Sequence, residues 1–197
     1  MHDKEIEVSP NTYTLFETEL GTCGIAWKNS GRPNQTPLVI GFQLPEATAR
    51  ITAERFTKKW MATRTAAIPP RIRDIISRVT LHLRGQTQDF RDIELDLDGS
   101  GRFAQQVYEA ARAIPAGRTM TYGQLAEAAG HAGAARAVGL ALANNPILLI
   151  IPCHRFFPCS RGTERQRSGT AATPRPVWWP LWVSGRCASP RPRQCAS

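Results

Sequence analysis

A pair of short helices joined by a glycine-containing turn is the sequence feature that most constrains the fold of this chain. Thr121 and Gln124 have the spacing of a capping box, in which a hydroxyl at the N-cap and an amide three residues later begin a helix. That helix is expected to end at Gly130, and a second helix to start near Ala134 and end before Pro146. This pattern predicts a helix-turn-helix, a unit found both in DNA-binding domains and in other small helical hairpins.

An apolar run follows these helices and leads to a cysteine. The run Ile147–Ile151 is flanked by prolines, which is typical of a buried strand. Cys153 comes at the end of this expected strand and is followed by His154 and Arg155. A cysteine attacks as its thiolate, and a nearby cation or imidazole lowers the usual thiol pKa of roughly 8.5. From these residues alone, Cys153 is either a nucleophile or a packed residue at the end of a strand.

Residues 1–99 have the pattern of a small α/β module. The expected elements are strand-like runs within 12–27 and 38–43, an amphipathic helix at 72–83 and an alternating strand at 93–97. Turns are expected at Gly21 and Gly24. Short strands followed by a helix and another strand favour the α/β (α+β) class.

This first module carries no pattern of catalytic residues. Cys23 stands alone among glycine and apolar residues, which is typical of a core position. Neither His2 nor His82 has metal-ligand spacing relative to it, so no zinc site is predicted. We expect the module to be structural and the chain to bind no metal.

The excess positive charge is concentrated near the C-terminus. Residues 158–197 hold seven Arg and one acid, and so account for +6 of the formal charge of +9. Outside Val177–Trp182, their apolar residues show neither helical nor strand periodicity. One interpretation is a basic arm whose Trp residues stack on nucleic-acid bases. The interpretation we favour is a disordered extension, in its sharpest form a tail translated out of frame from GC-rich DNA.

No segment indicates a membrane protein or a secreted one. The apolar run Ile147–Ile151 has five residues, whereas a membrane-spanning helix needs roughly 20. The N-terminus has no apolar stretch behind a basic start, as a signal peptide would. We expect a cytoplasmic protein with no membrane partner.

Four stretches of the chain carry a family resemblance. They are 114–126 (IPAGRTMTYGQLA), 134–139 (AARAVG), 145–146 (NP) and 151–155 (IPCHR). Together they resemble the O6-alkylguanine-DNA alkyltransferases, also called methylated-DNA–protein-cysteine methyltransferases. The resemblance is strong over the helix-turn-helix region and weaker over the first module. It implies a ribonuclease-H-like α/β domain at 1–99 and a winged-helix-like helix-turn-helix domain at 100–157, which leaves residues 158–197 as an aberrant, disordered basic tail.

The resemblance also implies a mechanism. An alkylated base is flipped out of double-stranded DNA, and its alkyl group moves irreversibly to Cys153, with His154 taking the thiol proton through a water. The second helix enters the minor groove, where Arg136 fills the space of the flipped base and Tyr122 rotates the target nucleotide. Asn145 holds the loop that carries the acceptor. The implied site consists of catalytic Cys153 and His154, and of substrate- and DNA-binding Tyr122, Ala134, Ala135, Arg136, Gly139, Asn145 and Arg155.

The same resemblance implies partners and location. The partner is double-stranded DNA that contains O6-alkylguanine, and no cofactor or metal is needed. The protein is expected to act as a monomer in a bacterial cytoplasm, on the nucleoid during repair.

The sequence departs from the family after Arg155. Family members continue with a Gly- and Ser-containing loop and a helix whose Glu orients the His, but no such helical pattern follows here, and Glu164 is too close to Arg155 for that role. A frameshift near codon 158 would explain the departure, because codons for 159–168 can encode a family-like loop one nucleotide later. Two alternatives to alkyl transfer therefore remain. One is a lesion-binding protein with little or no transfer activity, which the altered C-terminus favours. The other is a helix-turn-helix regulator with a structural Cys153, against which the sequence Pro-Cys-His-Arg at 152–155 argues.

Overall fold

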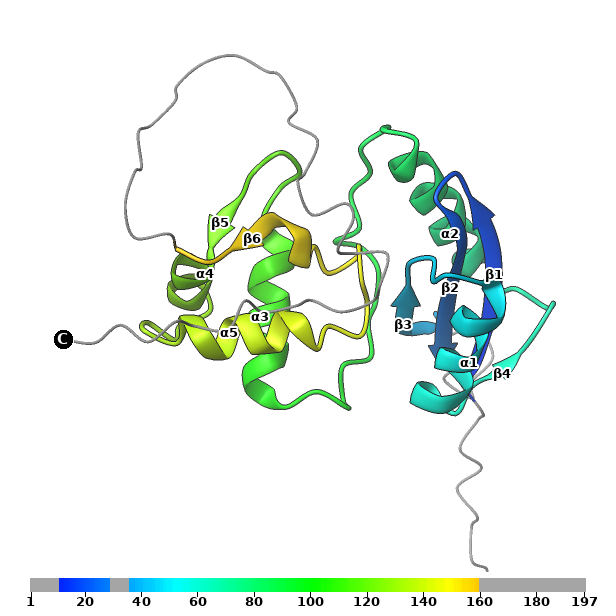
Figure 1. Cartoon of the computed structure of the whole chain (residues 1–197), viewed down its shortest axis with the longest axis horizontal. Helices are drawn as coiled ribbons and strands as arrows, with labels where there is room; N and C mark the ends of the chain where they lie inside the picture. The colour runs from blue at the N-terminus through cyan, green and yellow to red at the C-terminus, as the bar shows by residue number, and fades with distance from the viewer. Residues whose placement is uncertain (1–10, 29–35, 160–197) are drawn as a thin grey trace, which may run out of the picture.

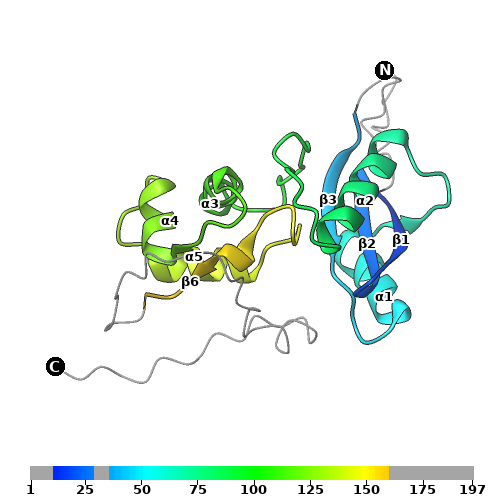
Figure 2. The same ribbon diagram turned by 90° about the horizontal axis from the view of Figure 1, so that it is seen from above.

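The computed structural model describes residues 11–28 and 36–159, which form two lobes side by side (Figures 1 and 2). The first lobe consists of β1 (Thr12–Thr18), β2 (Gly21–Lys28), β3 (Leu38–Gln43), α1 (Ala49–Trp60), β4 (Thr63–Arg64) and α2 (Pro70–Leu83). The second consists of α3 (Arg102–Ala113), β5 (Met120–Thr121), α4 (Tyr122–Ala128), α5 (Ala135–Ala143), the 3-10 helix η1 (Cys153–Arg155) and β6 (Phe156–Phe157). This is a mixed α/β fold, as predicted. The predictions for the tail beyond Cys159 fall outside the described residues.

The first lobe is a sheet with helices on both faces. The strand order is β3-β2-β1-β4, with β1/β2 and β2/β3 antiparallel and β4 parallel to β1. Cys23 and Ile25 of β2 pack in one hydrophobic cluster with Ile75 of α2, whereas the next residue, Ala26, packs in another with Phe56 of α1. The predicted strands and the helix at 72–83 are confirmed, and Cys23 is fully buried, as expected of a core residue.

Helix α1 was not predicted, and it explains a wrong prediction at Gly24. That residue lies inside β2 rather than in a turn, and a Cβ on it would stand 2.2 Å from Cε2 of Phe56. On β3, a Cβ on Gly41 would stand 2.5 Å from the Trp60 ring. The two glycines therefore let the aromatic side chains of α1 lie directly on the sheet, a contact that only the tertiary fold reveals.

Two predicted strands are absent as strands from the described structure. In 93–97, only Leu95 forms an isolated bridge, to Val39 of β3. The run Ile147–Ile151 is buried, but it turns at Leu149, whose φ is +68°. Burial selects apolar residues equally for strands and for buried loops, so the pattern alone could not separate the two.

The helix-turn-helix prediction is confirmed by α4 and α5. Thr121 and Gln124 form both hydrogen bonds of the capping box at the start of α4. The turn to α5 contains Gly130 and Gly133 with φ of +79° and +82°, a left-handed conformation that favours glycine. Helix α3 packs against both helices, and β5 pairs with β6 in parallel. None of the helices in the described part of the chain has the length and apolar character that a membrane span requires.

Candidate active site

Cys153 is the first residue of the 3-10 helix η1 and is buried. Its backbone N–H donates a hydrogen bond to the Ile151 carbonyl over 2.8 Å. The preceding residues turn sharply, because the Ile150 N–H donates to the Leu148 carbonyl, also over 2.8 Å. The thiol is thus carried by a short rigid connection between a buried turn and β6, and not by the end of a strand.

Asn145 ties the two ends of this turn together. Its side chain is buried, its Oδ1 accepts from the Ile147 N–H over 2.9 Å, and its Nδ2 donates to the Ile151 carbonyl over 2.9 Å. That carbonyl also accepts from the Cys153 N–H, so one oxygen atom separates the Asn145 amide from the cysteine backbone. The Asn145 side chain thus links Ile147 with Ile151 across the turn that leads to Cys153, and the loop-holding role that the family resemblance implies for it stays a prediction.

The first lobe supports the same loop. The Phe42 N–H of β3 donates to the Pro146 carbonyl over 3.1 Å, and the Leu148 N–H donates back to the Phe42 carbonyl over 3.2 Å. Ile147 and Phe42 are both fully buried in a single hydrophobic cluster that extends through both lobes. The module expected to be merely structural therefore holds the segment that leads to Cys153, a role that local sequence patterns could not reveal.

Tyr108 is a residue near Cys153 that the sequence reasoning missed. It lies on α3, and its buried hydroxyl donates to the Ala141 carbonyl of α5 over 2.8 Å. Burial, together with negative charge on Cys153, raises the pKa of Tyr108 to about 12. The Tyr108 hydroxyl therefore stays protonated, and its hydrogen bond joins α3 to α5 close to the Cys153 thiol. In the sequence, the helical spacing of Phe103, Val107, Tyr108 and Ala111 indicates only that Tyr108 lies on the buried face of its helix.

His154 is partly exposed and is held in its neutral form. The protein atoms packed around its ring disfavour the imidazolium, and the positive charges of Arg155 and His82 add to this effect, so the pKa of His154 lies below its usual value. A neutral imidazole can accept a proton at neutral pH. The charges that act on this ring within the described chain are cationic, and none of them is a carboxylate.

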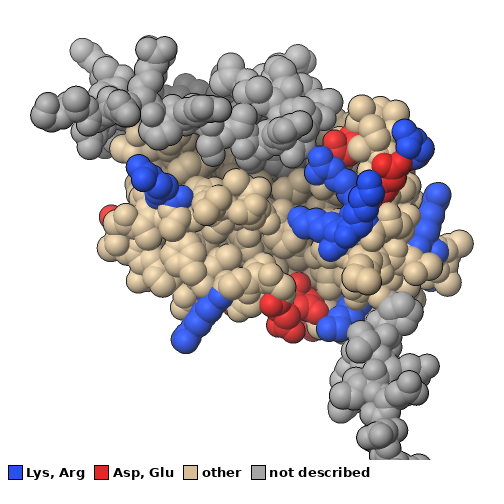
Figure 3. Space-filling model, turned by 60° about the horizontal axis from the view of Figure 1, so that its bottom comes forward, with Lys and Arg blue, Asp and Glu red and all other residues tan. Residues whose placement is uncertain are grey.

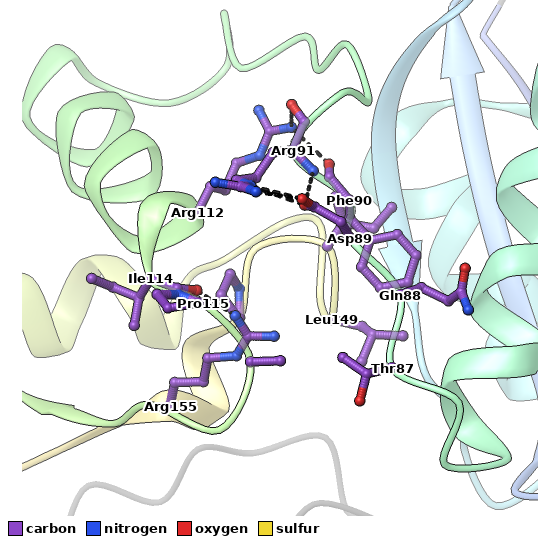
Figure 4. Close-up of a pocket in the computed structure, with 13 residues that line it drawn as sticks. Thr87, Gln88, Asp89, Phe90, Arg91, Arg112, Ile114, Pro115, Leu149 and Arg155 are labelled. Atoms are coloured by element: carbon purple, nitrogen blue, oxygen red, sulfur yellow. Dashed lines mark hydrogen bonds and ion pairs between the residues drawn. The ribbon is translucent and has the colours of Figure 1, made fainter.

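Arg155 lies in a cavity of about 240 Å³ that does not include Cys153 (Figure 4). It donates a hydrogen bond to the Ile114 carbonyl just after α3. Another residue of the cavity wall, Arg112, donates from Nη2 to the carbonyls of Phe90, Arg91 and Ile93 over 2.7–3.0 Å. Arg112 thus binds backbone carbonyls of the segment that precedes α3, Arg155 binds one within its own lobe, and Arg91 in the same wall pairs with the Asp89 carboxylate.

Helices α4 and α5 bring Tyr122 and Gly139 together. A Cβ on Gly139 would stand 3.3 Å from Cε2 of the Tyr122 ring, so the glycine gives the ring room. Arg136 is exposed in the first turn of α5, whereas Ala134 packs in part against the hydrophobic core. Gly139 was expected to face DNA, and the structure adds that it faces Tyr122.

Five of the predicted site residues make three local contacts. Asn145 and Cys153 meet through Ile151, Tyr122 meets Gly139, and Arg155 is turned to Ile114. Ala135 and Arg136 belong to the start of α5. The direct DNA and substrate contacts assigned to these residues stay predictions.

The surface of the second lobe is poor in acidic residues. From Ala128 to Cys159 the sequence has no Asp or Glu, while it has Arg136 and Arg155. In Figure 3 the half of the molecule that contains α3–α5 presents a broad uncharged face with few Lys or Arg side chains, and charges of both signs gather on the other half. A surface of this kind can approach a polyanion without repulsion.

Comparisons of sequence agree with this geometry. The family model of the 6-O-methylguanine DNA methyltransferase DNA-binding domain matches residues 102–173. The methylated-DNA–protein-cysteine methyltransferase of Mycobacterium leprae is 46% identical over 87 residues, which cover 44% of this chain and 52% of the relative. The match therefore spans about half the length of this curated relative.

Solved structures extend the similarity to the first lobe. The O6-methylguanine methyltransferase of Mycobacterium tuberculosis is 30% identical with a TM-score of 0.58, over 75% of this chain and 79% of that one. A structure of the M. tuberculosis protein in complex with DNA is 27% identical with a TM-score of 0.56, over the same shares of the two chains.

Proposed function

This chain belongs to the 6-O-methylguanine DNA methyltransferase family, and we propose that it repairs double-stranded DNA by moving the alkyl group of an O6-alkylguanine to its own Cys153. Residues 100–157 serve as the DNA-binding and acceptor domain, and residues 1–99 form a supporting domain. The protein acts as a monomer, and each molecule removes one alkyl group.

The proposed transfer is a single displacement. His154, neutral at pH 7, takes the proton of the Cys153 thiol through a water. The thiolate sulfur attacks the alkyl carbon and forms a C–S bond, while the bond from that carbon to guanine O6 breaks. The electron pair of the broken bond stays on guanine, which takes up a proton. The thioether is stable, so the protein is consumed, and the balanced reaction requires no cofactor or metal.

Access to the alkyl carbon requires the base to leave the duplex, at a cost of a few kcal/mol. We assign this step to α4 and α5. The α5 helix enters the minor groove, the exposed Arg136 fills the space of the flipped base, and Tyr122 acts on the phosphate of the target nucleotide. The absence of Asp and Glu between Ala128 and Cys159 favours this approach to the phosphate backbone.

The observation that carries the proposal is the fixed loop around Cys153. Asn145 and the Cys153 N–H share the Ile151 carbonyl, and β3 holds the other end of the loop through Phe42. A displacement reaction needs its nucleophile held in one position relative to the substrate. A merely packed cysteine would not need a buried amide that bridges its own loop.

The direct test is the mass of the intact protein after incubation with a duplex that carries one O6-methylguanine. The proposal predicts a gain of one methyl group in the wild-type protein and none in Cys153→Ala. A folded wild-type protein that binds the duplex and gains no methyl group would contradict alkyl transfer.

A lesion-binding function with little transfer is the second candidate. It is favoured by the surroundings of His154, because within the described part of the chain the charges acting on its ring come from Arg155 and His82, and a histidine that lacks a carboxylate partner there is a weaker base. Tight binding of the methylated duplex with no mass gain would support this candidate.

A further inference from the structure

Helix α5 is apolar on its exposed side as well as on its buried side. Arg136 is the one polar side chain among its nine residues. Val138, Ala141 and Leu142 are buried in the core, whereas Leu140 is 66% exposed. Leu140 is one turn after Arg136, so the two side chains share a face of the helix.

An apolar exposed face needs a physical reason. A helix that is hydrophobic all round is normally buried, and a surface helix normally has polar residues on its outer side. The exposed positions of α5 are instead Arg136, Ala137, Leu140 and Ala143. The side chains of the two alanines end at Cβ, so Leu140 and Arg136 project beyond the rest of this face. This shape indicates a surface that another molecule covers.

The charge of the exposed α5 face indicates which kind of molecule covers it. The segment from Ala128 to Cys159 has no acidic residue, and the charged group on the exposed face is the guanidinium of Arg136. A protein partner would need an acidic residue placed opposite the Arg136 guanidinium, whereas DNA supplies a phosphate on each nucleotide. The small residues around Leu140 let the helix enter a narrow groove, and an apolar wedge in the minor groove packs on deoxyribose or between base steps.

We propose that Leu140 is a further DNA-contacting side chain of α5, an apolar wedge that packs in the minor groove one turn from Arg136. This inference rests on the proposed function, because it takes α5 as the groove-binding helix. Leu140 stabilises the opened duplex through shape and desolvation, and Arg136 adds the charge. Neither composition nor helical periodicity distinguishes Leu140 from a core leucine, so its exposure is the decisive observation.

The test compares Leu140→Ala with Met61→Ala, which removes a similarly large apolar side chain that is 85% exposed at the end of α1 in the other lobe. Both variants are made in the full chain. Binding to a duplex with one O6-methylguanine is followed by fluorescence anisotropy at several salt concentrations. A 2-aminopurine beside the lesion reports how far the stack opens, and thermal unfolding checks the fold.

Leu140→Ala is expected to weaken binding about tenfold, the loss typical of one buried leucine side chain. Its salt dependence should match that of the wild type, because no phosphate contact is lost. Its 2-aminopurine signal should fall, and Met61→Ala should behave as the wild type in every measurement.

Wild-type affinity and wild-type 2-aminopurine signal in Leu140→Ala would overturn the inference while leaving the proposed function intact. So would an affinity loss that is accompanied by a lower melting temperature, because it would assign Leu140 to the fold. A wild-type protein that neither binds nor demethylates the duplex would contradict the proposed function itself.

Discussion

Replacing Asn145 with alanine tests how the cysteine loop is held. The side chain makes two hydrogen bonds inside a buried turn, from the Ile147 N–H and to the Ile151 carbonyl, both over 2.9 Å. The Ile147 N–H would lose its acceptor, which costs about 1–3 kcal/mol for a buried donor. The Ile151 carbonyl would still accept a hydrogen bond from the Cys153 N–H, so the loss of its bond from Asn145 should cost only about 1 kcal/mol. We expect the free energy of unfolding to fall by about 2–4 kcal/mol in total.

Urea unfolding of the full chain measures this quantity, and Asn144→Ala is the matched control. Asn144 is the preceding residue and is exposed, and its Nδ2 donates to the Leu140 carbonyl, which also accepts from the Asn144 N–H. Its replacement should change the free energy of unfolding by less than ~0.5 kcal/mol. Asn145→Asp keeps the acceptor for Ile147 but sets a buried carboxylate oxygen against the Ile151 carbonyl, so it should destabilise the fold at least as much as Asn145→Ala.

The transfer rate gives the functional half of the same experiment. Under conditions where Asn145→Ala stays folded, methyl transfer should slow by about 100-fold or more, because small misplacements of a nucleophile have effects of that size. Asn144→Ala should react at the wild-type rate. If Asn145→Ala were as stable and as fast as Asn144→Ala, the argument that the amide positions Cys153 would be refuted.

Three further predictions concern the surroundings of the site. Gly139→Ala should leave the free energy of unfolding within about 1 kcal/mol of wild type, since alanine favours helix. It should weaken binding of the lesion, because the added Cβ would stand 3.3 Å from the Tyr122 ring. Urea unfolding measures the first quantity and fluorescence anisotropy the second, and unchanged binding would contradict the packing argument. Tyr108→Phe should lower the free energy of unfolding by ~1 kcal/mol through the lost hydrogen bond between α3 and α5, and a neutral effect would show that this bond is not stabilising. The pKa values of His154 and His82 are both lowered, mainly by burial, so the unfolded chain binds more protons just below pH 6.5 and stability should fall as the pH drops from 7 toward 5. Unfolding curves across this range should show a shallower fall for His154→Gln, and an identical fall would contradict the shift.

The helical part of the fold could be predicted because its signals are local. The capping box of Thr121 and Gln124, and the glycines of the turn, each fix a few neighbouring residues, and α4 and α5 follow from them. Helix α1 has a local start signal in the Thr48 N-cap but no capping box, and its large aromatic residues, Phe56 and Trp60, find their place only against Gly24 and Gly41 of the sheet. Information of that kind is absent from any window of the sequence.

The candidate site likewise has some residues that the sequence could indicate and others that only the fold reveals. Cys153 and His154 could be proposed from their place just after the apolar run, whereas Asn145 and Arg136 were assigned to the site by the family resemblance. The support from Phe42 and the approach of Tyr108 join residues far apart in the chain, and no local pattern marks them. The apolar run before Cys153 was wrongly predicted as a strand because burial, and not backbone pairing, selects its side chains.

The measurement that tests the central claim most directly is the location of the transferred methyl group. Trypsin cleaves after Arg136 and Arg155, and the peptide Ala137–Arg155 between them contains Cys153 as its one cysteine. After reaction with an excess of duplex that carries O6-methylguanine, mass spectrometry should find one methyl group on the Cys153 sulfur of this peptide. A methyl group on Cys159 or another residue, or an unmodified peptide from a folded protein, would contradict the account.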